Sequence, residues 1–205
     1  MAKSALPNAA IGLRVHSGWA AMLVAAGAAE TPEVIARRRI EICDTKIRGS
    51  KQPYHAAEPM GFTDAKAFIE RCDSRTHALA REAIEAAVAG IGDRRCEPRS
   101  CAVLQASGRE LPELAAILRS HALIHTAEGE FYRKAMMDAA VHCGLCVVAI
   151  KERELYDRAA EQLKRTRKQI DAWIAETGKK LGPPWTQDQK LAALAAWIAL
   201  AMPRR

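Results

Sequence analysis

The chain has 205 residues, which is enough for one sizeable domain with a complete hydrophobic core. Apolar residues make up 49% of the sequence and charged residues 27%, as in ordinary folded proteins, so a disordered or fibrous chain is excluded. No apolar run approaches the ~20 residues that a membrane-spanning helix needs. The net charge of +7 permits contact with nucleic acid or another acidic surface but does not establish it.

The first three predicted elements are strands. Residues 11–16 and 19–26 flank a tight Ser17-Gly18 turn and predict a hairpin, and Pro32 introduces a third strand over residues 33–43. Along that strand, period two places Val34, Ala36, Arg38, Ile40 and Ile42 on one side and Ile35, Arg37, Arg39 and Glu41 on the other. The pattern predicts an antiparallel meander whose last strand has one partly wet face.

The middle of the chain alternates between helix and strand. Residues 44–62, with several glycines and prolines, predict a long loop, and Thr63 can cap a helix that runs to about Gly90. Helices that begin at Pro112 and end at Gly144 separate two short apolar runs. These runs, residues 100–106 and 145–150, suit buried parallel strands.

Two helices are expected at the C-terminal end. Residues 152–177 predict a strongly charged helix, and residues 186–202 predict an apolar helix that begins with the capping box Thr186-Gln-Asp-Gln189. The whole order predicts a single α/β domain over residues 1–205, with these two helices packed on it. Its core is expected to be a mixed five-stranded sheet, a three-stranded antiparallel meander followed by two parallel strands, with helices on both faces.

This order resembles the ribonuclease H-like superfamily and, within it, the Holliday-junction resolvase group. The segment Ile11-Gly-Leu-Arg-Val-His-Ser-Gly-Trp-Ala20 is similar to that group's first strand and turn. The segment His142-Cys-Gly-Leu-Cys-Val-Val-Ala-Ile150 is similar to the helix and strand that end its sheet. The segment Asp188-Gln-Lys-Leu-Ala-Ala-Leu-Ala-Ala-Trp-Ile-Ala-Leu200 is similar to its closing alanine-rich helix.

The resemblance implies a two-metal nuclease centre, and the residues at the corresponding places depart from it. Resolvases of this kind hold metal with acids on the first strand, at the end of the fourth strand and on the last helix. This chain has Arg14, Gln105 and Asp188 at those places, without a second acid one turn along the last helix. Because a guanidinium adds positive charge where metal must bind, we expect no metal-dependent nuclease activity and no cofactor. The sequence favours a non-catalytic binding or assembly protein whose cleft is lined by Arg14, His16, Gln105 and Asp188.

Two other functions stay open, and the first is an enzyme with a rebuilt site. His121 and His125 are one turn apart on a predicted helix, and Glu128 follows. This spacing puts two imidazoles and a carboxylate on one face, where they could bind zinc or transfer protons. His55, in the predicted loop, could join them. The simpler interpretation is a helix face whose histidines pack at the edge of the sheet.

The second alternative is a relative of the resolvases that binds nucleic acid without cleavage. Lys164, Arg165, Arg167 and Lys168 predict a basic surface on the charged helix, whereas Arg37–Arg39 lies in a strand and splits between its faces. Because no aromatic residue is interleaved, only phosphate contact is supported. An ordinary solvated helix is the simpler interpretation. The sequence fixes neither a partner nor an oligomeric state, and a homo-oligomer is compatible with it.

The cysteines were considered as metal ligands. The start of the chain lacks the apolar core of a secretory signal, so we expect a cytoplasmic protein with reduced thiols. If the last two strands are parallel neighbours, one end of the sheet would bring together four cysteines: Cys96, Cys101, Cys143 and Cys146. These thiols could then bind a structural zinc ion. Their spacing is loose, so we expect buried, inert cysteines and no metal.

Overall fold

A five-stranded mixed sheet forms the centre of the protein. The computed structural model describes residues 5–106 and 110–203, so the first four residues, which bear on the expectation about a secretory signal, lie outside it. The strand order is β3-β2-β1-β4-β5. β1 (Asn8–His16), β2 (Trp19–Ala26) and β3 (Glu33–Glu41) pair antiparallel, while β4 (Glu97–Gln105) and β5 (Cys146–Lys151) run parallel to β1. The predicted meander followed by two parallel strands is confirmed.

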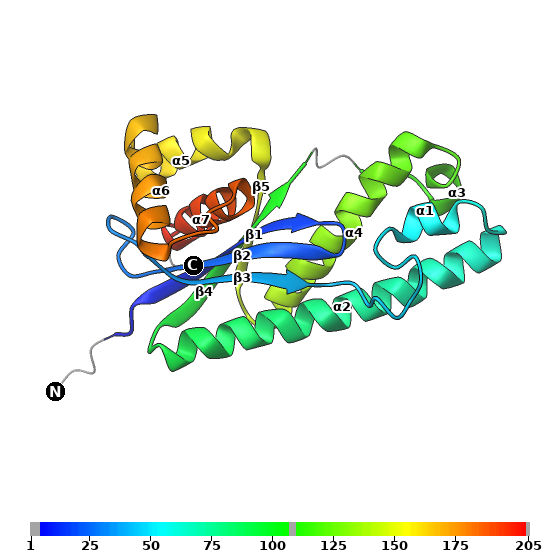
Figure 1. The fold of residues 1–205 in the computed structure, drawn as a ribbon, viewed down its shortest axis with the longest axis horizontal. Coiled ribbons are helices and arrows are strands. Elements are labelled where there is room, and N and C mark those ends of the chain that lie inside the picture. Colours follow the sequence, from blue (N-terminus) through cyan, green and yellow to red (C-terminus); the bar gives the residue numbers. More distant parts are fainter. Residues whose placement is uncertain (1–4, 107–109, 204–205) are drawn as a thin grey trace.

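Helices cover both faces of the sheet, as Figure 1 shows. One face carries α2 (Phe62–Asp93) and α4 (His121–His142), and the other carries α7 (Gln187–Leu200) with α5 (Leu155–Leu163) and α6 (Arg167–Leu181) beside it. The short helices α1 (Pro53–Ala57) and α3 (Leu114–Ile117) pack against α4, at the end of the molecule away from α5 and α6. Within the described ranges, no helix is both long and apolar enough to cross a bilayer.

The α7 helix packs directly on β1 because small residues meet at their contact. A Cβ atom on Gly12 would overlap the carbonyl oxygen of Ala192 and lie 2.5 Å from the backbone nitrogen of Ala196. All ten residues from Leu191 to Leu200 are buried. The Thr186 capping box that begins α7 is present as predicted, with both of its hydrogen bonds to Gln189. This close packing fixes the first turn of α7 at the carboxyl end of β1.

The predicted alternation of β3 is wrong at its start. The register between β2 and β3 shifts between Val24 and Ala25, so that Ile35 is the extra residue of a β-bulge. Val34 therefore packs on the α7 side of the sheet, whereas Ala36 packs on the α2 side. One inserted residue reverses the face of everything before it, because side chains alternate with period two.

The predicted loop over residues 44–62 is also wrong in part, because it contains α1. Pro53 stands in the first turn of that helix, where a missing backbone N–H costs nothing. Ala57 is fully buried, and it anchors α1 in the core. A helix of five residues is too short to show a 3.6-residue period in the sequence.

The expected bounds of α2 need correction at both ends. Its N-cap is Gly61, and no side chain caps the first turn. Thr63 therefore lies inside the helix and does not cap it. At the other end, buried Ile91 continues the apolar stripe past Gly90. Packing against the core therefore extends this helix beyond its glycine.

The predicted charged helix over residues 152–177 is two helices with a break between them. Residues 152–154 form a 3-10 turn, and Lys164 ends α5 in the left-handed conformation with φ of 52°. Thr166 then begins α6 through a capping box with Gln169, and α6 runs to Leu181, past the predicted end at residue 177. The Thr-x-x-Gln spacing that marks the second helix was visible in the sequence and was missed.

Candidate functional site

The candidate site lies at the carboxyl ends of the three parallel strands, where ligand clefts form in open α/β sheets. Arg14 and His16 come from β1, Gln105 is the last residue of β4, and Glu152 follows β5 directly. These four residues line a pocket of about 510 Å³, together with Arg133 of α4, Arg153 and the neighbouring Val15, Leu104 and Ala106.

Arg14 forms the centre of this site. Its Nε and Nη2 atoms donate to the two carboxylate oxygens of Glu152, at 2.9 Å each, and its Nη1 atom donates to Asp188 in the first turn of α7. Bidentate pairing of this kind is among the stronger ionic contacts in proteins. The hydrogen bonds to Glu152, which outweigh partial burial, raise the pKa of Arg14 above its usual range. One guanidinium therefore ties the end of β5 and the start of α7 to β1.

His16 extends the cluster toward the hairpin turn. Its Nε2 atom lies 2.9 Å from Asp188 Oδ1, and its ring stacks on Trp19 with centroids 4.3 Å apart and planes 13° apart. The Arg39 guanidinium lies over the same Trp19 ring, 3.7 Å from its centroid. Although partial burial favours the neutral acid, hydrogen bonds from His16 and Arg14 hold the pKa of Asp188 below its usual range. Asp188 is thus ionised at neutral pH and its charge is compensated within the protein.

The residues at this site do not fit the pair of divalent metal ions that the ribonuclease H-like resemblance implies. Two-metal hydrolysis needs several carboxylate oxygens that are free to ligate. Here both carboxylates, Glu152 and Asp188, bond to a fixed cation, and the end of β4 supplies the neutral amide of Gln105. A dication would have to displace the guanidinium of Arg14 from between them. The arrangement is an internal ion-pair cluster.

The structure brings together the four residues predicted to line the cleft. Arg14, His16 and Gln105 line the pocket, and Asp188 contacts the first two of them from α7. Glu152 was missed, although its place directly after the predicted last parallel strand is a signal that could have found it. That strand is the edge of the sheet and only Ile150 in it is buried, so the expectation of a buried strand is wrong there. Arg133 was also missed, and no sequence signal marks it, because it projects from the middle of α4.

A second group of titratable side chains lies where α1 meets α4. His55 joins His121 and His125, and the atoms with which they could hold a metal all lie within 4.8 Å of one another. Glu128, one turn further along α4, is buried and accepts hydrogen bonds from the backbone of Tyr54 and His55. The four residues considered for a rebuilt site are therefore close together, with Glu128 directed at α1.

The cysteines do not form such a group. In the part of the chain that the structure describes, the three histidines are the only set of three or more candidate ligands close enough to share a metal ion. Cys101 is fully enclosed within β4, and burial raises the pKa of its thiol to about 12. Burial also raises the pKa of the Cys143 thiol, so neither residue favours the thiolate form that binds metal.

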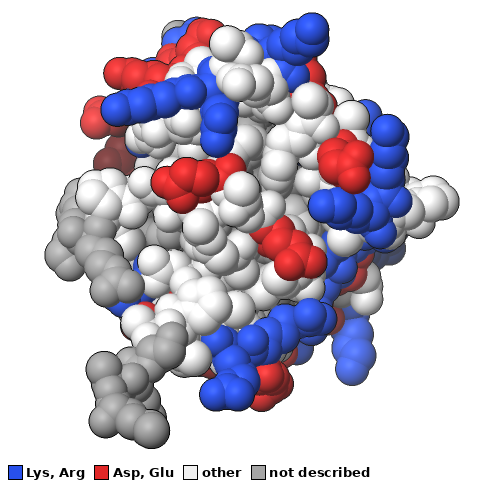
Figure 2. All heavy atoms as spheres, turned by 90° about the vertical axis from the view of Figure 1, so that its left-hand side faces the viewer, with Lys and Arg blue, Asp and Glu red and all other residues white. Residues whose placement is uncertain are grey.

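The basic segment predicted to contact nucleic acid does not form one helical face. Lys164 lies in the break, Arg165 donates to the backbone oxygen of Glu30 at 3.3 Å, and Arg167 covers the Tyr156 ring at 3.5 Å from its centroid. Lys168 is exposed on α6. Figure 2 shows that basic side chains on this side of the molecule form separate groups with acidic ones between them. The segment offers scattered positive charges and no continuous basic surface.

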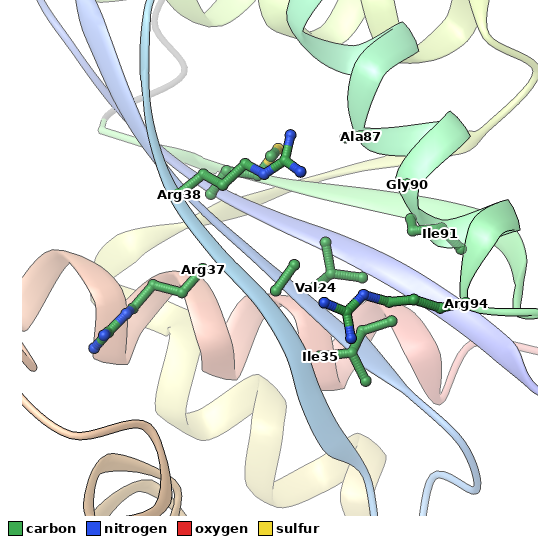
Figure 3. Close-up of a pocket in the computed structure, with 10 residues that line it drawn as sticks. Val24, Ile35, Arg37, Arg38, Ala87, Gly90, Ile91 and Arg94 are labelled. Atoms are coloured by element: carbon green, nitrogen blue, oxygen red, sulfur yellow. The ribbon is translucent and has the colours of Figure 1, made fainter.

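The three arginines of β3 split between the faces of the sheet, as predicted. Arg37 donates to the backbone oxygens of Gly182 and Pro184, whereas Arg38 lies on the α2 side. There, Arg38 and Arg94 turn toward a pocket of about 230 Å³ between β3 and α2, over an apolar lining (Figure 3). The residues that line this pocket include no acid and no nucleophile, so it offers charge but no catalytic group.

Comparisons with known proteins support the fold. No protein-family model and no curated protein matches the chain. Among solved structures it is similar to RuvC of Thermus thermophilus, with 13% identity and a TM-score of 0.50 over 93% of this chain and 92% of that one. T. thermophilus RuvC in complex with a Holliday junction substrate matches with the same identity and score, over 93% and 91% of the two chains. The predicted ribonuclease H-like fold of the resolvase type is confirmed.

Proposed function

We propose that this protein binds nucleic acid at the carboxyl ends of its parallel strands and does not cut it. The observation that carries the proposal is the Arg14 guanidinium, which neutralises Glu152 and Asp188 where nucleases of this fold hold metal. The structure of T. thermophilus RuvC in complex with a Holliday junction substrate, which has the same fold, supports DNA as the class of ligand. The net charge of +7 is compatible with the same class.

The contact with phosphate groups is assigned to Arg133 and Arg153. Both line the pocket of about 510 Å³. Arg133 is only 15% exposed and pairs with Glu130 at 3.1 Å, but its Nε atom is buried without a hydrogen-bond partner among the described residues, so it still has a donor to offer. The Arg153 side chain is 75% exposed, and its contact with Glu154 is long at 3.4 Å. Replacing that contact with one to a phosphate group therefore costs little free energy. Arg14 has its charge compensated by two carboxylates, so it stabilises the cleft and does not contribute to phosphate binding.

The test measures binding and cleavage separately. Anisotropy of a labelled four-way DNA junction, and of duplex and single strands of equal length, is followed in EDTA over a series of salt concentrations. Each phosphate contact contributes about 0.9 to the slope of log K against log salt. We expect the double variant Arg133→Gln/Arg153→Gln to reduce the slope by about 2. The control Lys179→Gln/Lys180→Gln removes two charges from exposed positions on α6 and should leave the slope unchanged.

Cleavage of the same DNA is assayed with magnesium and with manganese, and no product is expected. Cutting that disappears in Asp188→Asn would overturn the claim that the cleft is non-catalytic. Absence of binding to any of the three DNA forms at low salt would overturn the claim of nucleic-acid binding. A slope that falls with Lys164→Gln/Lys168→Gln, and not with the Arg133 and Arg153 double variant, would move the contact to the other basic segment.

A further inference from the structure

Three histidines from two separate helices converge at the junction of α1 and α4. His55 comes from α1, and His121 and His125 occupy the first two turns of α4. We propose that these three imidazoles bind one divalent transition-metal ion, best fitted by zinc, with the fourth coordination position open to solvent. This inference does not depend on the proposed binding of nucleic acid. It departs from the sequence-based expectation that the protein holds no metal.

The spacing of the nitrogen atoms suits a single ion. The Nε2 atoms of His121 and His125 lie 3.0 Å apart, and all three candidate ligand atoms lie within 4.8 Å of one another. Two nitrogens on one tetrahedral zinc stand about 3.3 Å apart, because each Zn–N bond is about 2.0–2.1 Å. The pair on α4 is therefore close to the required separation, and the His55 nitrogen, at most 4.8 Å from the other two, would move closer to them when the ion binds.

Packing alone does not account for this convergence. His121 and His125 are exposed, so burial of apolar surface does not hold their rings together. Ring centroids are 4.5 Å apart for His121 and His125, 4.7 Å for His55 and His125, and 5.4 Å for His55 and His121. Imidazole nitrogens are among the ligands that zinc prefers.

Glu128 holds His55 in the orientation that metal binding requires. One of its oxygens, Oε1, lies 3.2 Å from His55 Nδ1 and also accepts the backbone N–H groups of Tyr54 at 2.8 Å and His55 at 3.1 Å. With Nδ1 donating to the carboxylate, the lone pair of Nε2 is left for the metal. A carboxylate behind a metal-bound histidine fixes its tautomer and raises its basicity.

The same carboxylate gives an independent reason to expect a cation nearby. The Glu128 residue is only 3% exposed, and its second oxygen is buried without a hydrogen-bond partner among the described residues. A buried carboxylate that lacks part of its hydrogen bonding is costly unless positive charge compensates it. A dication bound through His55 would supply that charge one residue away from the carboxylate.

The number of ligands indicates the kind of site. Three protein ligands with an open fourth position are typical of zinc sites that bind water or another exchangeable ligand, whereas structural sites use four. Because His121 and His125 face solvent, the open position is accessible. Water or an anionic oxygen donor is the ligand class that this position would take. The bound ion would also tie α1 to the first turns of α4.

The test uses the full chain, purified without a histidine tag and stripped of metal with EDTA. Cobalt(II) is titrated in, and its visible d–d absorption reports tetrahedral binding, after which zinc is added in competition. We expect one cobalt per chain, nitrogen-type spectra without the thiolate charge-transfer band, and displacement by zinc. His121→Ala and His125→Ala should each weaken binding more than tenfold. Glu128→Gln should weaken it by about 10–100-fold, as found for carboxylates behind metal ligands.

His142→Ala is the matched control, because His142 is exposed at the other end of the same helix. The affinity of this variant for cobalt should equal that of the wild type. Circular dichroism checks that each variant is folded. If the buried change Glu128→Gln unfolds the protein, the variants at positions 121 and 125 still decide the test, because these positions are exposed and their substitution should leave the fold intact. No cobalt binding, binding unchanged in both His121→Ala and His125→Ala, or a thiolate band in the cobalt spectrum would each overturn the proposal.

Discussion

Replacing Arg14 with aspartate tests whether the guanidinium occupies the place of a metal ion. The change removes the bidentate bond to Glu152 and the bond to Asp188, and it places a third carboxylate beside them. The Glu152 side chain is 40% exposed, so water replaces most of its lost contact and the loss is about 0.5–1 kcal/mol. The Asp188 side chain is 24% exposed and keeps its hydrogen bond with His16. Loss of its contact with Arg14 should therefore lower the free energy of unfolding by about 1 kcal/mol.

Repulsion among the three carboxylates should add about 1 kcal/mol in this partly solvated site. The free energy of unfolding of Arg14→Asp is therefore expected to fall by about 3 kcal/mol. Arg14→Met, which loses the cation without adding a charge, should lose only about 2 kcal/mol. Three carboxylates also make a site for magnesium. At a magnesium concentration ten times the dissociation constant, the aspartate variant should regain about 1.4 kcal/mol.

Urea denaturation with and without magnesium measures these differences for the wild type and both variants. The reasoning is refuted if Arg14→Asp is as stable as the wild type, because the guanidinium would then not hold the cluster. It is equally refuted if magnesium stabilises the wild type or Arg14→Met as much as the aspartate variant. In that case the ion binds elsewhere.

Three further predictions concern stability. Gly12→Ala should cost about 3 kcal/mol in thermal or urea unfolding because its Cβ meets the α7 backbone, while Gly92→Ala, with open space around it, should be neutral or stabilising; equal effects would contradict the close contact. Because the folded-state pKa of Asp188 is lowered, its contribution is present above the unfolded pKa of about 3.9 and is lost as pH falls through the folded value. The stability difference between wild type and Asp188→Asn should thus be constant above about pH 5 and shrink below about pH 4; a difference that grows on acidification would show the sign to be wrong. Thr166→Ala should cost about 1 kcal/mol through loss of the α6 capping box, against no more than a few tenths for Thr126→Ala, a half-buried control inside α4.

Local patterns in the sequence determined the framework of the fold. The Ser17-Gly18 turn and the flanking apolar runs predicted the hairpin, and the spacing of Thr186 and Gln189 predicted the start of α7. These signals work because each depends on residues within a few positions of one another. The sequence also placed Arg14 in the first strand, and with Gln105 and the missing second acid on the last helix this raised the expectation that metal-dependent cleavage is lost.

Tertiary packing decided the features that no local pattern encodes. The β-bulge at Ile35 depends on how β3 meets β2. The pairing of Arg14 with Glu152 joins residues that are 138 positions apart.

The convergence of His55 on His121 and His125 likewise requires α1, which is too short to leave a periodic signal, to pack against α4. The sequence by itself therefore determined the order of the strands along the chain and placed Arg14, His16 and Gln105 near the ends of β1 and β4. Only the folded chain determined which of those side chains meet, because contacts between distant residues follow from the burial of whole helix and sheet faces.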